Sequence, residues 1–356
     1  MKIEKEIEKF LVPEKGGVEF LGTGCTTLNL ACSQRGSLGG VPRGRITNLV
    51  GDGSSGKTLL AIEICANALF NLKEREAFLY PKVKKVEIVY NNIEGVMDFP
   101  LEKMYGEKFR KSVQWIQTPT CEEFGRDFMQ RLQKHKEGTA LIYVVDSLDA
   151  LVPKAALQRT MASLKSNTDE KDSFGMEKAN FFSRKFFDRL CSMMMGKDVS
   201  LICISQVRDN IGVTFGEKSR RTGGRALNFY SHLVIWLAEI EKLRKTYDGH
   251  TNVYGVKIRA RIKRNKVAKA FREADYTVIN DYGMSNIDSC IDYLYGNDAK
   301  KIEWDNGKEI VVFPREKLVH YIESKPKAMQ RLTSMVESQW KEVEKKTSVV
   351  RKRRFE

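Results

Sequence analysis

The sequence lacks the features of a secreted or membrane protein. No apolar run in the 356 residues approaches the roughly 20 residues that cross a bilayer. The N-terminal segment alternates in charge and has no apolar stretch of the kind found in secretory signals. The seven cysteines are scattered, without a C-x-x-C pair or a nearby histidine cluster. We therefore expect reduced thiols, no zinc site and no disulfide framework, in a cytoplasmic protein.

Internal repeats and low-complexity tracts are also missing, so the chain is not expected to be a repeat array or a disordered protein. Its length allows one large α/β domain and a smaller appendage. Acidic residues are few relative to basic ones, which gives a net charge of +15. This excess favours a polyanionic partner, although a solvated lysine-rich surface would produce the same count.

The sequence does contain a complete phosphate-binding loop. It follows a strand-like run at 45–50 and precedes a helix-like run at 59–70. Glycines let backbone N–H groups turn inward around an anion, and the following helix directs its positive end to the same point. We predict that the loop binds a nucleoside triphosphate, with a hydroxyl for Mg²⁺, rather than forming an empty glycine-rich turn. Its residues are Gly51, Asp52, Gly53, Ser54, Ser55, Gly56, Lys57 and Thr58.

Two acidic residues follow predicted strands. Asp146 ends the apolar strand 141–145, where a carboxylate can hold Mg²⁺ beside a phosphate loop. Glu94 follows the strand 86–90 and is placed to orient a water on the γ-phosphate. The spacing alone does not distinguish this role of Glu94 from that of an ordinary surface glutamate.

The second of two polar segments is a candidate for contact with a sugar–phosphate backbone. We expect irregular loops at 153–178 and at 207–225, both rich in basic residues. Considered alone, the second segment fits a solvated surface loop better than a nucleic-acid contact. The helix between them, 179–195, carries an aromatic stripe that we expect in the core: Phe181, Phe182, Phe186 and Phe187.

The period changes from 253 onward. Basic residues alternate with apolar ones over 257–263, which predicts an antiparallel strand with one wet, basic face, and 274–280 returns beside it. Composition changes again after 296. We predict a short N-terminal segment at 1–21, a core at 22–296, and an α+β appendage at 297–356. The appendage contains an Asn306-Gly307 hairpin turn, two helices and a basic tail.

Together these residues resemble the RecA family of recombinases, nearest to its bacterial and phage members. The similarity extends from about residue 22 to residue 295. The phosphate loop alone is shared with many ATPases, whereas the run 206–230 is much more specific to this family. The motifs that carry the resemblance are 51–58, Glu94 with Asp98, 144–147, 153–155, 205–208, 211–216, 222–230 and 264–266.

The resemblance implies an α/β fold with a RecA-like phosphate-loop core. This is a mostly parallel sheet with helices on both faces, an antiparallel edge extension and a small C-terminal α+β appendage. It also implies ATP and Mg²⁺ as cofactors, with Lys57 and Thr58 on phosphate and metal and Asp146 on the metal's water shell. Glu94 would activate the water, and Asp98 and Tyr105 would lie near adenine.

Coupling and partner contacts are implied in the same way. Gln206 would sense the γ-phosphate, while Arg264 and Lys266 would reach the ATP of a neighbouring subunit, with Phe229 at that interface. Arg264 stands where bacterial members usually carry lysine, so the charge is kept but the geometry differs. The implied DNA-binding residues are Arg208, Gly212, Arg220, Arg221, Gly223, Gly224, Arg225, Lys154 and Arg159.

The function expected from this resemblance is a DNA-dependent ATPase. It would form filaments on single-stranded DNA and catalyse homologous pairing and strand exchange, in a bacterial cell or a phage-infected host. The basic tail suggests that the appendage also captures double-stranded DNA. Two alternatives remain open: a RecA-core helicase or motor, and a mediator that binds ATP and DNA without exchanging strands.

Overall fold

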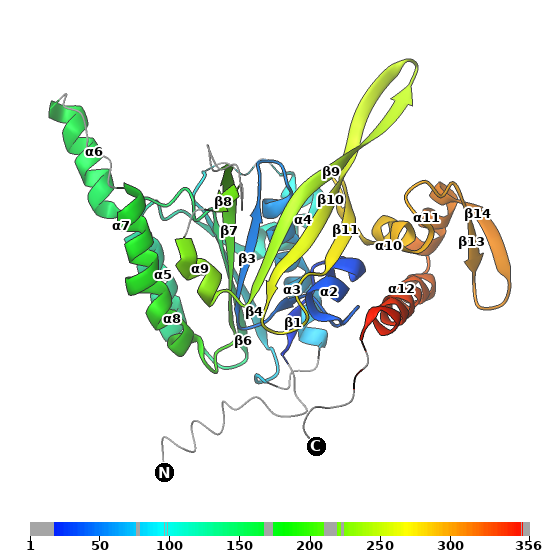
Figure 1. Ribbon diagram of the computed structural model, residues 1–356, viewed down its shortest axis with the longest axis horizontal. Coiled ribbons are helices and arrows are strands. Elements are labelled where there is room, and N and C mark those ends of the chain that lie inside the picture. Colours follow the sequence, from blue (N-terminus) through cyan, green and yellow to red (C-terminus); the bar gives the residue numbers. More distant parts are fainter. Residues whose placement is uncertain are drawn as a thin grey trace, which may run out of the picture.

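The computed structural model describes residues 18–75, 79–95, 97, 99–166, 174–209, 219–221, 224–349 and 351. One large sheet forms its centre (Figure 1). The strands of this sheet are β3 (Ile46–Gly51), β4 (Lys85–Asn92), β5 (Val113–Ile116), β6 (Thr139–Asp146), β7 (Val199–Asp209), β8 (Ser219–Arg221), β9 (Leu233–Tyr247), β10 (His250–Asn265), β11 (Glu273–Ile279) and β12 (Gly283–Ser285). A small separate pair, β1 (Phe20–Leu21) and β2 (Val41–Pro42), lies before β3.

The sheet is parallel in the middle and antiparallel at one edge. Its order is β12-β11-β10-β9-β3-β7-β6-β4-β5, with β8 paired to β7. Strands β9, β3, β7, β6, β4 and β5 run parallel to one another, and β10, β11 and β12 form an antiparallel extension. The predicted fold class is confirmed. In a parallel sheet the carboxyl ends of all strands lie at the same edge. The phosphate loop and the strand-end carboxylates therefore lie close together.

Helices cover both faces of the sheet because alternate strand residues point to opposite sides. In β6, Ile142 and Val144 pack in the core with α3 (Lys57–Asn71), whereas Leu141, Tyr143 and Val145 pack on the other face. The first face also carries α2 (Thr26–Ser33), the short η1 (Leu72–Glu74) and α4 (Leu101–Ser112). The second carries α5 (Cys121–Gln133), the π-helix η2 (Phe181–Phe186) and α8 (Phe187–Met194).

Three of the four phenylalanines of the aromatic stripe, Phe182, Phe186 and Phe187, are buried on the second face as predicted, and Phe181 is half-buried against the same cluster. The prediction of an irregular loop at 153–178 is wrong. Helices α6 (Lys154–Ser166) and α7 (Phe174–Asn180) occupy the described part of this segment. The alanines, leucines and methionine of α6 are strong helix formers, and this preference outweighs the polar residues that suggested a loop. Helix α6 extends away from the body of the molecule (Figure 1).

The antiparallel strands β9 and β10 are longer than their neighbours. Beyond Leu237, β9 no longer pairs with β3, so the rest of the hairpin projects past the sheet (Figure 1). The predicted alternation in β10 is confirmed on its apolar side, where Ile258, Ala260 and Ile262 are buried. The prediction of a fully wet basic face is wrong at Lys257, which is buried and forms a 3.0 Å ion pair with Asp292.

The C-terminal part packs directly on the core. It contains α10 (Asn286–Tyr295), β13 (Lys301–Asp305), β14 (Ile310–Pro314), α11 (Arg315–Glu323) and α12 (Pro326–Thr347). Trp304, Leu332 and Trp340 belong to the same apolar cluster as α2 and α3. The predicted hairpin is present, but β13 and β14 are joined by the four residues 306–309 instead of a two-residue turn. The boundary at 296 therefore separates compositions, and its status as a domain boundary stays a prediction.

No helix within the described ranges is both long and apolar enough to cross a membrane. All seven cysteines are free thiols, and Cys191 is the only one that is not buried.

Candidate functional site

The phosphate loop takes the conformation that its glycines allow. The chain leaves β3 at Gly51 and enters α3 at Lys57, with left-handed backbone at Ser54 (φ 61°) and Gly56 (φ 80°). A Cβ on Gly56 would lie 2.4 Å from Cδ1 of Ile258, so the packing of β10 also demands glycine there. No side chain caps the N-terminus of α3. The exposed N–H groups of this helix end are a suitable anion site.

Lys57 is folded back onto its own loop. Its Nζ donates to the carbonyl oxygen of Asp52 and, at 3.4 Å, to Oγ of Ser55. Burial lowers the pKa of Lys57, and the carboxylates of Asp146 and Glu94 oppose this shift. A phosphate would supply the negative charge that this ammonium group otherwise obtains from carboxylates.

Asp146 is fixed by two hydroxyl groups. Oγ1 of Thr58 and the Tyr90 hydroxyl both donate to its Oδ2, at 2.8 Å and 2.7 Å. Burial raises the pKa of Asp146, and these two hydrogen bonds pull it back. A buried carboxylate beside a threonine hydroxyl, at the mouth of the phosphate loop, is an oxygen donor set that fits Mg²⁺. The chemistry of the residues thus agrees with the predicted metal role of Thr58 and Asp146.

Glu94 and Gln206 meet beside this pair. Oε1 of Glu94 accepts from Oγ of Ser147 at 2.6 Å and from Nε2 of Gln206 at 3.1 Å. Both donors come from neighbouring strands: Ser147 follows β6, and Gln206 lies in β7. The structure thus brings the two residues together at the carboxyl end of the sheet. Their roles in hydrolysis and signalling stay predictions.

The segment after Gln206 begins as a strand. Val207, Arg208 and Asp209 of β7 pair with Arg221, Arg220 and Ser219 of β8. Helix α9 (Gly224–Tyr230) follows and includes Gly224 and Arg225 at its start. The predicted loop at 207–225 therefore has an ordered base within the described residues. Gly212 and Gly223 lie outside them.

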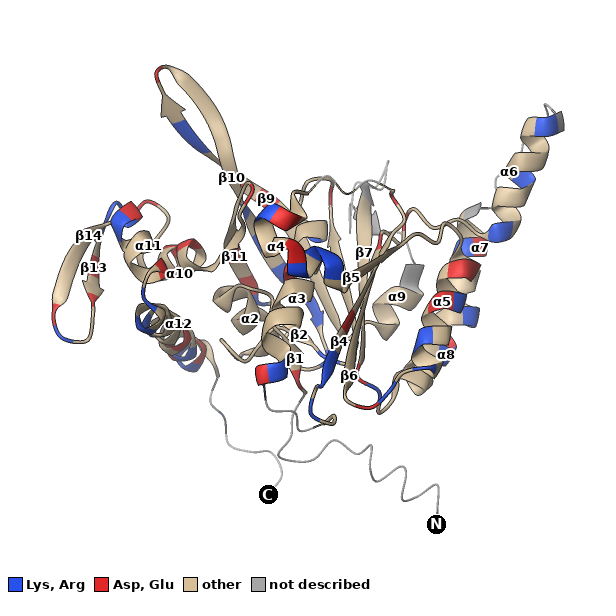
Figure 2. Ribbon diagram, turned by 180° about the vertical axis from the view of Figure 1, so that it is seen from behind, with Lys and Arg blue, Asp and Glu red and all other residues tan. Residues whose placement is uncertain are grey.

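The first basic segment lies on a helix. The backbone N–H of Lys154, at the start of α6, donates to Oε2 of Glu122 at 2.8 Å. Arg159 forms a 2.9 Å ion pair with Glu177 of α7. Lysine and arginine residues are spaced along the length of α6 (Figure 2). The two predicted DNA contacts therefore sit on a projecting helix, where they remain predictions.

Arg264 and Lys266 lie at the opposite end of the sheet from the phosphate loop. Between them, Asn265 pairs with Leu233, which pairs with Thr47 at the start of β3. Gly51 is level with Leu237 and thus with Ala260, five residues earlier in β10. This offset is roughly 16 Å along the strand direction. The pair therefore lies away from its own subunit's phosphate loop.

Lys266 is held in place at that end. Its Nζ donates to the carbonyl oxygen of Phe229 at 2.7 Å, and it lies 5.5 Å from the centre of the Phe229 ring. Phe229 itself is 63% exposed, which is high for an aromatic side chain. Burial and then the charge of Arg264 lower the pKa of Lys266. This exposed phenylalanine and the lysine beside it are accessible to another molecule.

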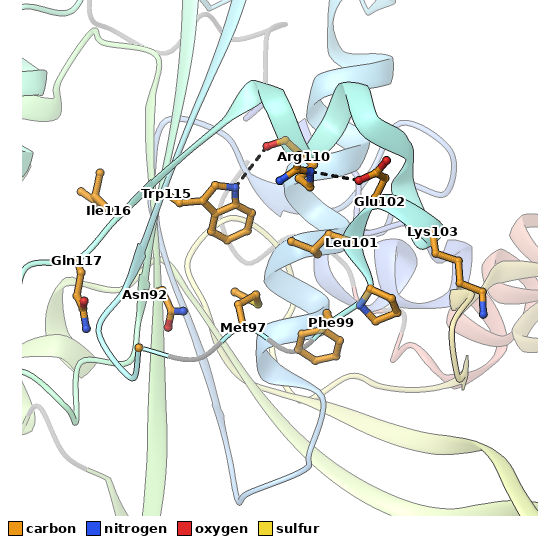
Figure 3. Close-up of a pocket in the computed structure, with 12 residues that line it drawn as sticks. Asn92, Met97, Phe99, Leu101, Glu102, Lys103, Arg110, Trp115, Ile116 and Gln117 are labelled. Atoms are coloured by element: carbon orange, nitrogen blue, oxygen red, sulfur yellow. Dashed lines mark hydrogen bonds and ion pairs between the residues drawn. The ribbon is translucent and has the colours of Figure 1, made fainter.

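A pocket of about 720 Å³ opens beside Glu94, between the segment that follows β4 and strand β5 (Figure 3). Met97, Phe99 and Trp115 provide apolar surface, and Asn92 and Gln117 provide amides (Figure 3). Such a lining suits a flat aromatic group with polar edges, such as a nucleobase.

The structure describes only one of the two residues predicted to lie near adenine. Asp98 lies outside the described residues, although its neighbours Met97 and Phe99 line the pocket. Tyr105 is described, but it does not line this pocket. Its hydroxyl instead donates to Oε1 of buried Glu63 at 2.9 Å. Contact between Tyr105 and adenine therefore stays a prediction without structural support.

The sequence did not single out Tyr90, Ser147 or Asp149, which complete the site. Tyr90 and Ser147 donate hydrogen bonds to Asp146 and Glu94, and Asp149 accepts one from the backbone of Gln206. Tyr90 could have been suspected, because it places a hydroxyl near the carboxyl end of β4, four residues before Glu94. Ser147 lies in the motif 144–147, but neither its contact with Glu94 nor that of Asp149 with Gln206 could be read from the sequence, because polar residues after a strand are ordinary turn residues.

Comparison with known proteins agrees with this geometry. A family model described as the RecA N-terminal domain matches residues 4–285. Protein RecA of Chlamydia trachomatis serovar L2 is 30% identical over 291 residues, which cover 81% of this chain and 73% of that protein. Protein RecA of Clostridium botulinum (strain Eklund 17B / Type B) is 28% identical over 296 residues, covering 82% and 73%.

The protein RecA of Streptomyces venezuelae is also 28% identical over 296 residues, covering 82% of this chain and 69% of the relative. The family model spans most of the chain, including the phosphate loop, both strand-end carboxylates and the β7 glutamine. On this evidence, the chain belongs to the RecA family.

Proposed function

We propose that this protein is a DNA-dependent ATPase that forms filaments on single-stranded DNA and catalyses homologous pairing and strand exchange with double-stranded DNA. It uses ATP with Mg²⁺ and acts in the cytoplasm of a bacterial cell or a phage-infected host. Membership of the RecA family supports this activity at the level of the family. The arrangement of the site supports the individual roles.

One observation carries the proposal. Gln206 donates its side-chain amide to Glu94, beside the phosphate loop, and its main chain continues directly into the β7–β8 base of the basic segment. A change at the γ-phosphate can thus reach that segment through a single residue. An ordinary nucleotidase has no need for such a connection.

The residues at the carboxyl end of the sheet divide the work of hydrolysis. Lys57 and the N–H groups at the start of α3 bind and orient the phosphates. Glu94, held by Ser147 and Gln206, takes a proton from the attacking water. Thr58 and Asp146 hold Mg²⁺, which, when bound, neutralises phosphate charge as it develops. The apolar pocket lined by Trp115 receives the base.

Hydrolysis is completed by a second subunit. Arg264 and Lys266 lie at the other end of the sheet from their own phosphate loop, so they can act on the nucleotide of a neighbour. Two cations supplied in this way stabilise the charge that develops on the transferred phosphoryl group. ATP turnover then depends on assembly.

The decisive test is ATP hydrolysis with and without single-stranded DNA, with Lys57→Ala as the control. We expect strong stimulation by DNA in the wild type and no hydrolysis in Lys57→Ala. Gln206→Ala should still bind ATP but lose the stimulation, since the connection to the basic segment is cut. A wild-type rate of ATP hydrolysis that does not change when single-stranded DNA is added would refute the proposed function.

The two alternatives are distinguished by product and assembly. Joint molecules formed with homologous but not heterologous duplex DNA identify a recombinase, and neither a motor nor a mediator produces them. Electron micrographs with DNA and ATP separate helical filaments from the closed rings of a hexameric motor. Absence of joint molecules despite DNA-stimulated hydrolysis would favour the motor.

A further inference from the structure

Asp149 lies at the junction of the elements that the proposed function must couple. It is the third residue after β6, in a turn where the Ala150 N–H donates to the Ser147 carbonyl at 3.1 Å. The N–H of Leu148 donates to the carbonyl of Ile204 in β7 at 2.9 Å. The turn is thus attached to the strand that carries Gln206, and the position of Asp149 is well defined.

The carboxylate of Asp149 holds the backbone of Gln206. Its Oδ2 accepts from the Gln206 N–H at 2.7 Å, while the Gln206 side chain donates to Glu94 on the other side. A charged acceptor makes this a strong hydrogen bond. Since Gln206 is where β7 leaves the nucleotide site, fixing its backbone also fixes the direction in which its side chain points.

The main chain of Asp149 holds a second element. Buried Lys178 of α7 donates its Nζ to the carbonyl oxygen of Asp149 at 2.7 Å. Helix α7 begins after residues 167–173, so it leads out of the first basic segment, as β7 leads into the second. Asp149 therefore contacts one element that adjoins each of the two basic segments, 153–178 and 207–225.

Asp149 also belongs to the electrostatic surroundings of the nucleotide. It is among the carboxylates whose charge opposes the lowering of the Lys57 pKa by burial. Its Oδ1 is buried and has no hydrogen-bond partner among the described residues. Charge that arrives at or leaves Lys57 therefore also acts on the Asp149 carboxylate.

We propose that Asp149 is a positioning residue that couples the nucleotide site to both basic segments, through the Gln206 backbone on one side and Lys178 on the other. This inference rests on the proposed function and adds to it a residue that transmits the state of the nucleotide. Asp149 does not touch the reacting atoms; it acts through Gln206.

The test compares Asp149→Ala, Asp149→Asn and the matched control Asp305→Ala. The control removes a similar carboxylate-to-backbone hydrogen bond, 2.8 Å from the Gly307 N–H, together with an ion pair to Arg331, in the C-terminal part. Asp149→Ala should lower the DNA-stimulated kcat by about tenfold and leave the KM for ATP within about twofold. Asp149→Asn keeps an acceptor oxygen and should recover most of the rate, and Asp305→Ala should match wild type.

A merely structural role would reduce basal and stimulated rates alike. Stimulation that persists in Asp149→Ala, or a KM that rises together with a falling kcat, would overturn the inference.

A measurement on the wild type needs no variant to fold. Hydrogen exchange with and without a non-hydrolysable ATP analogue should change together in 206–209 and in α7. A change in only one of them would contradict the coupling. If wild-type hydrolysis does not respond to DNA, the proposed function fails, and the exchange experiment still decides the role of Asp149.

Discussion

The side chains in this site are held in position by hydrogen bonds that the sequence does not predict. The phosphate loop and the strand-end carboxylates could be predicted because their spacing is fixed by backbone geometry. The Asp146 partner Tyr90 could not be predicted firmly. A tyrosine inside a strand usually indicates packing alone, and Tyr90 also packs 5.0 Å from the Trp115 ring.

Removing the Tyr90 hydroxyl should shift the acid limb of the activity profile. The pKa of Asp146 is already raised by burial, and the Tyr90 hydrogen bond lowers it. In Tyr90→Phe this carboxylate should therefore protonate at a higher pH, and ATP hydrolysis should decline earlier on acidification than in wild type. A pH series of kcat/KM at saturating Mg²⁺ measures the shift. Coincident acid limbs would show that this hydrogen bond does not tune Asp146.

His232 should make the folded state sensitive to acid. Burial, followed by the charges of Arg45, Lys266 and Arg264, lowers its pKa to about 4. The ordinary histidine value is about 6.5. Between these values the unfolded chain binds a proton that the folded chain does not, so stability falls as the pH falls. The slope is at most about 1.4 kcal/mol per pH unit.

Urea midpoints at pH 7 and pH 5 test the His232 prediction. We expect a larger loss on acidification in wild type than in His232→Asn, which cannot titrate in this range. The substituted position costs little in hydrogen bonding, because Nδ1 of His232 has no partner within the described part of the chain. Equal losses in the two proteins would contradict this assignment.

At the scale of elements, periodicity predicted the strands well and the polar segments poorly. The alternation in β10 identified Ile258, Ala260 and Ile262 as buried. It could not reveal that Lys257 is covered by α10, because that contact depends on where a later helix docks. Helix α6 was missed for the opposite reason, since its polar composition suggested a loop despite strong helix formers.

Besides its apolar packing, helix α12 contacts the core through the carboxylate of Glu344. Glu344 contacts Lys269 and Arg272, in the connection that follows Lys266. Glu344→Gln should weaken this attachment by about 1 kcal/mol, as expected for a partly exposed ion pair. Hydrogen exchange in the last turns of α12 should then become faster.

The matched control is Glu342→Gln on the same helix, since Glu342 pairs only locally, with Lys346 at 2.6 Å. If the two variants exchange equally fast, Glu344 does not anchor the helix.

At the scale of the whole molecule, strand order decides which groups meet. The sequence correctly suggested a parallel centre with an antiparallel extension. It could not show that Arg264 and Lys266 end up at the opposite edge from the phosphate loop, because this follows from the register of β10 on β9 and of β9 on β3. That register places the phosphate loop and the two cations at opposite ends of the subunit's sheet.

Two inactive variants should therefore restore activity to each other. Lys57→Ala lacks a phosphate-binding lysine, and Lys266→Ala lacks a cation for its neighbour. In an equal mixture, about a quarter of the interfaces would join an intact phosphate loop to an intact Lys266, if subunits associate head to tail at random. DNA-stimulated hydrolysis in the mixture should reach roughly that fraction of wild type. No recovery would show that Lys266 does not act across subunits.

The basic tail should strengthen binding to duplex DNA. Deleting residues 347–356 removes Arg351, Lys352, Arg353 and Arg354. Each phosphate that the shortened chain no longer neutralises should flatten the plot of log affinity against log salt by about 0.9. Duplex binding measured over a salt series tests this. An unchanged affinity and slope would exclude the tail from duplex capture.

The separation of Lys266 from its own phosphate loop has a consequence for any string of these subunits. If Lys266 acts across subunits, one terminal member has a nucleotide pocket that no neighbour completes, and the member at the far tip has cations with no nucleotide to act on. The two tips are chemically unlike, so gain and loss of subunits should proceed at different speeds at each. The terminal pocket, which lacks a neighbour's cations, would hydrolyse its triphosphate most slowly. Such incomplete pockets would be a larger share of all pockets in a short string than in a long one.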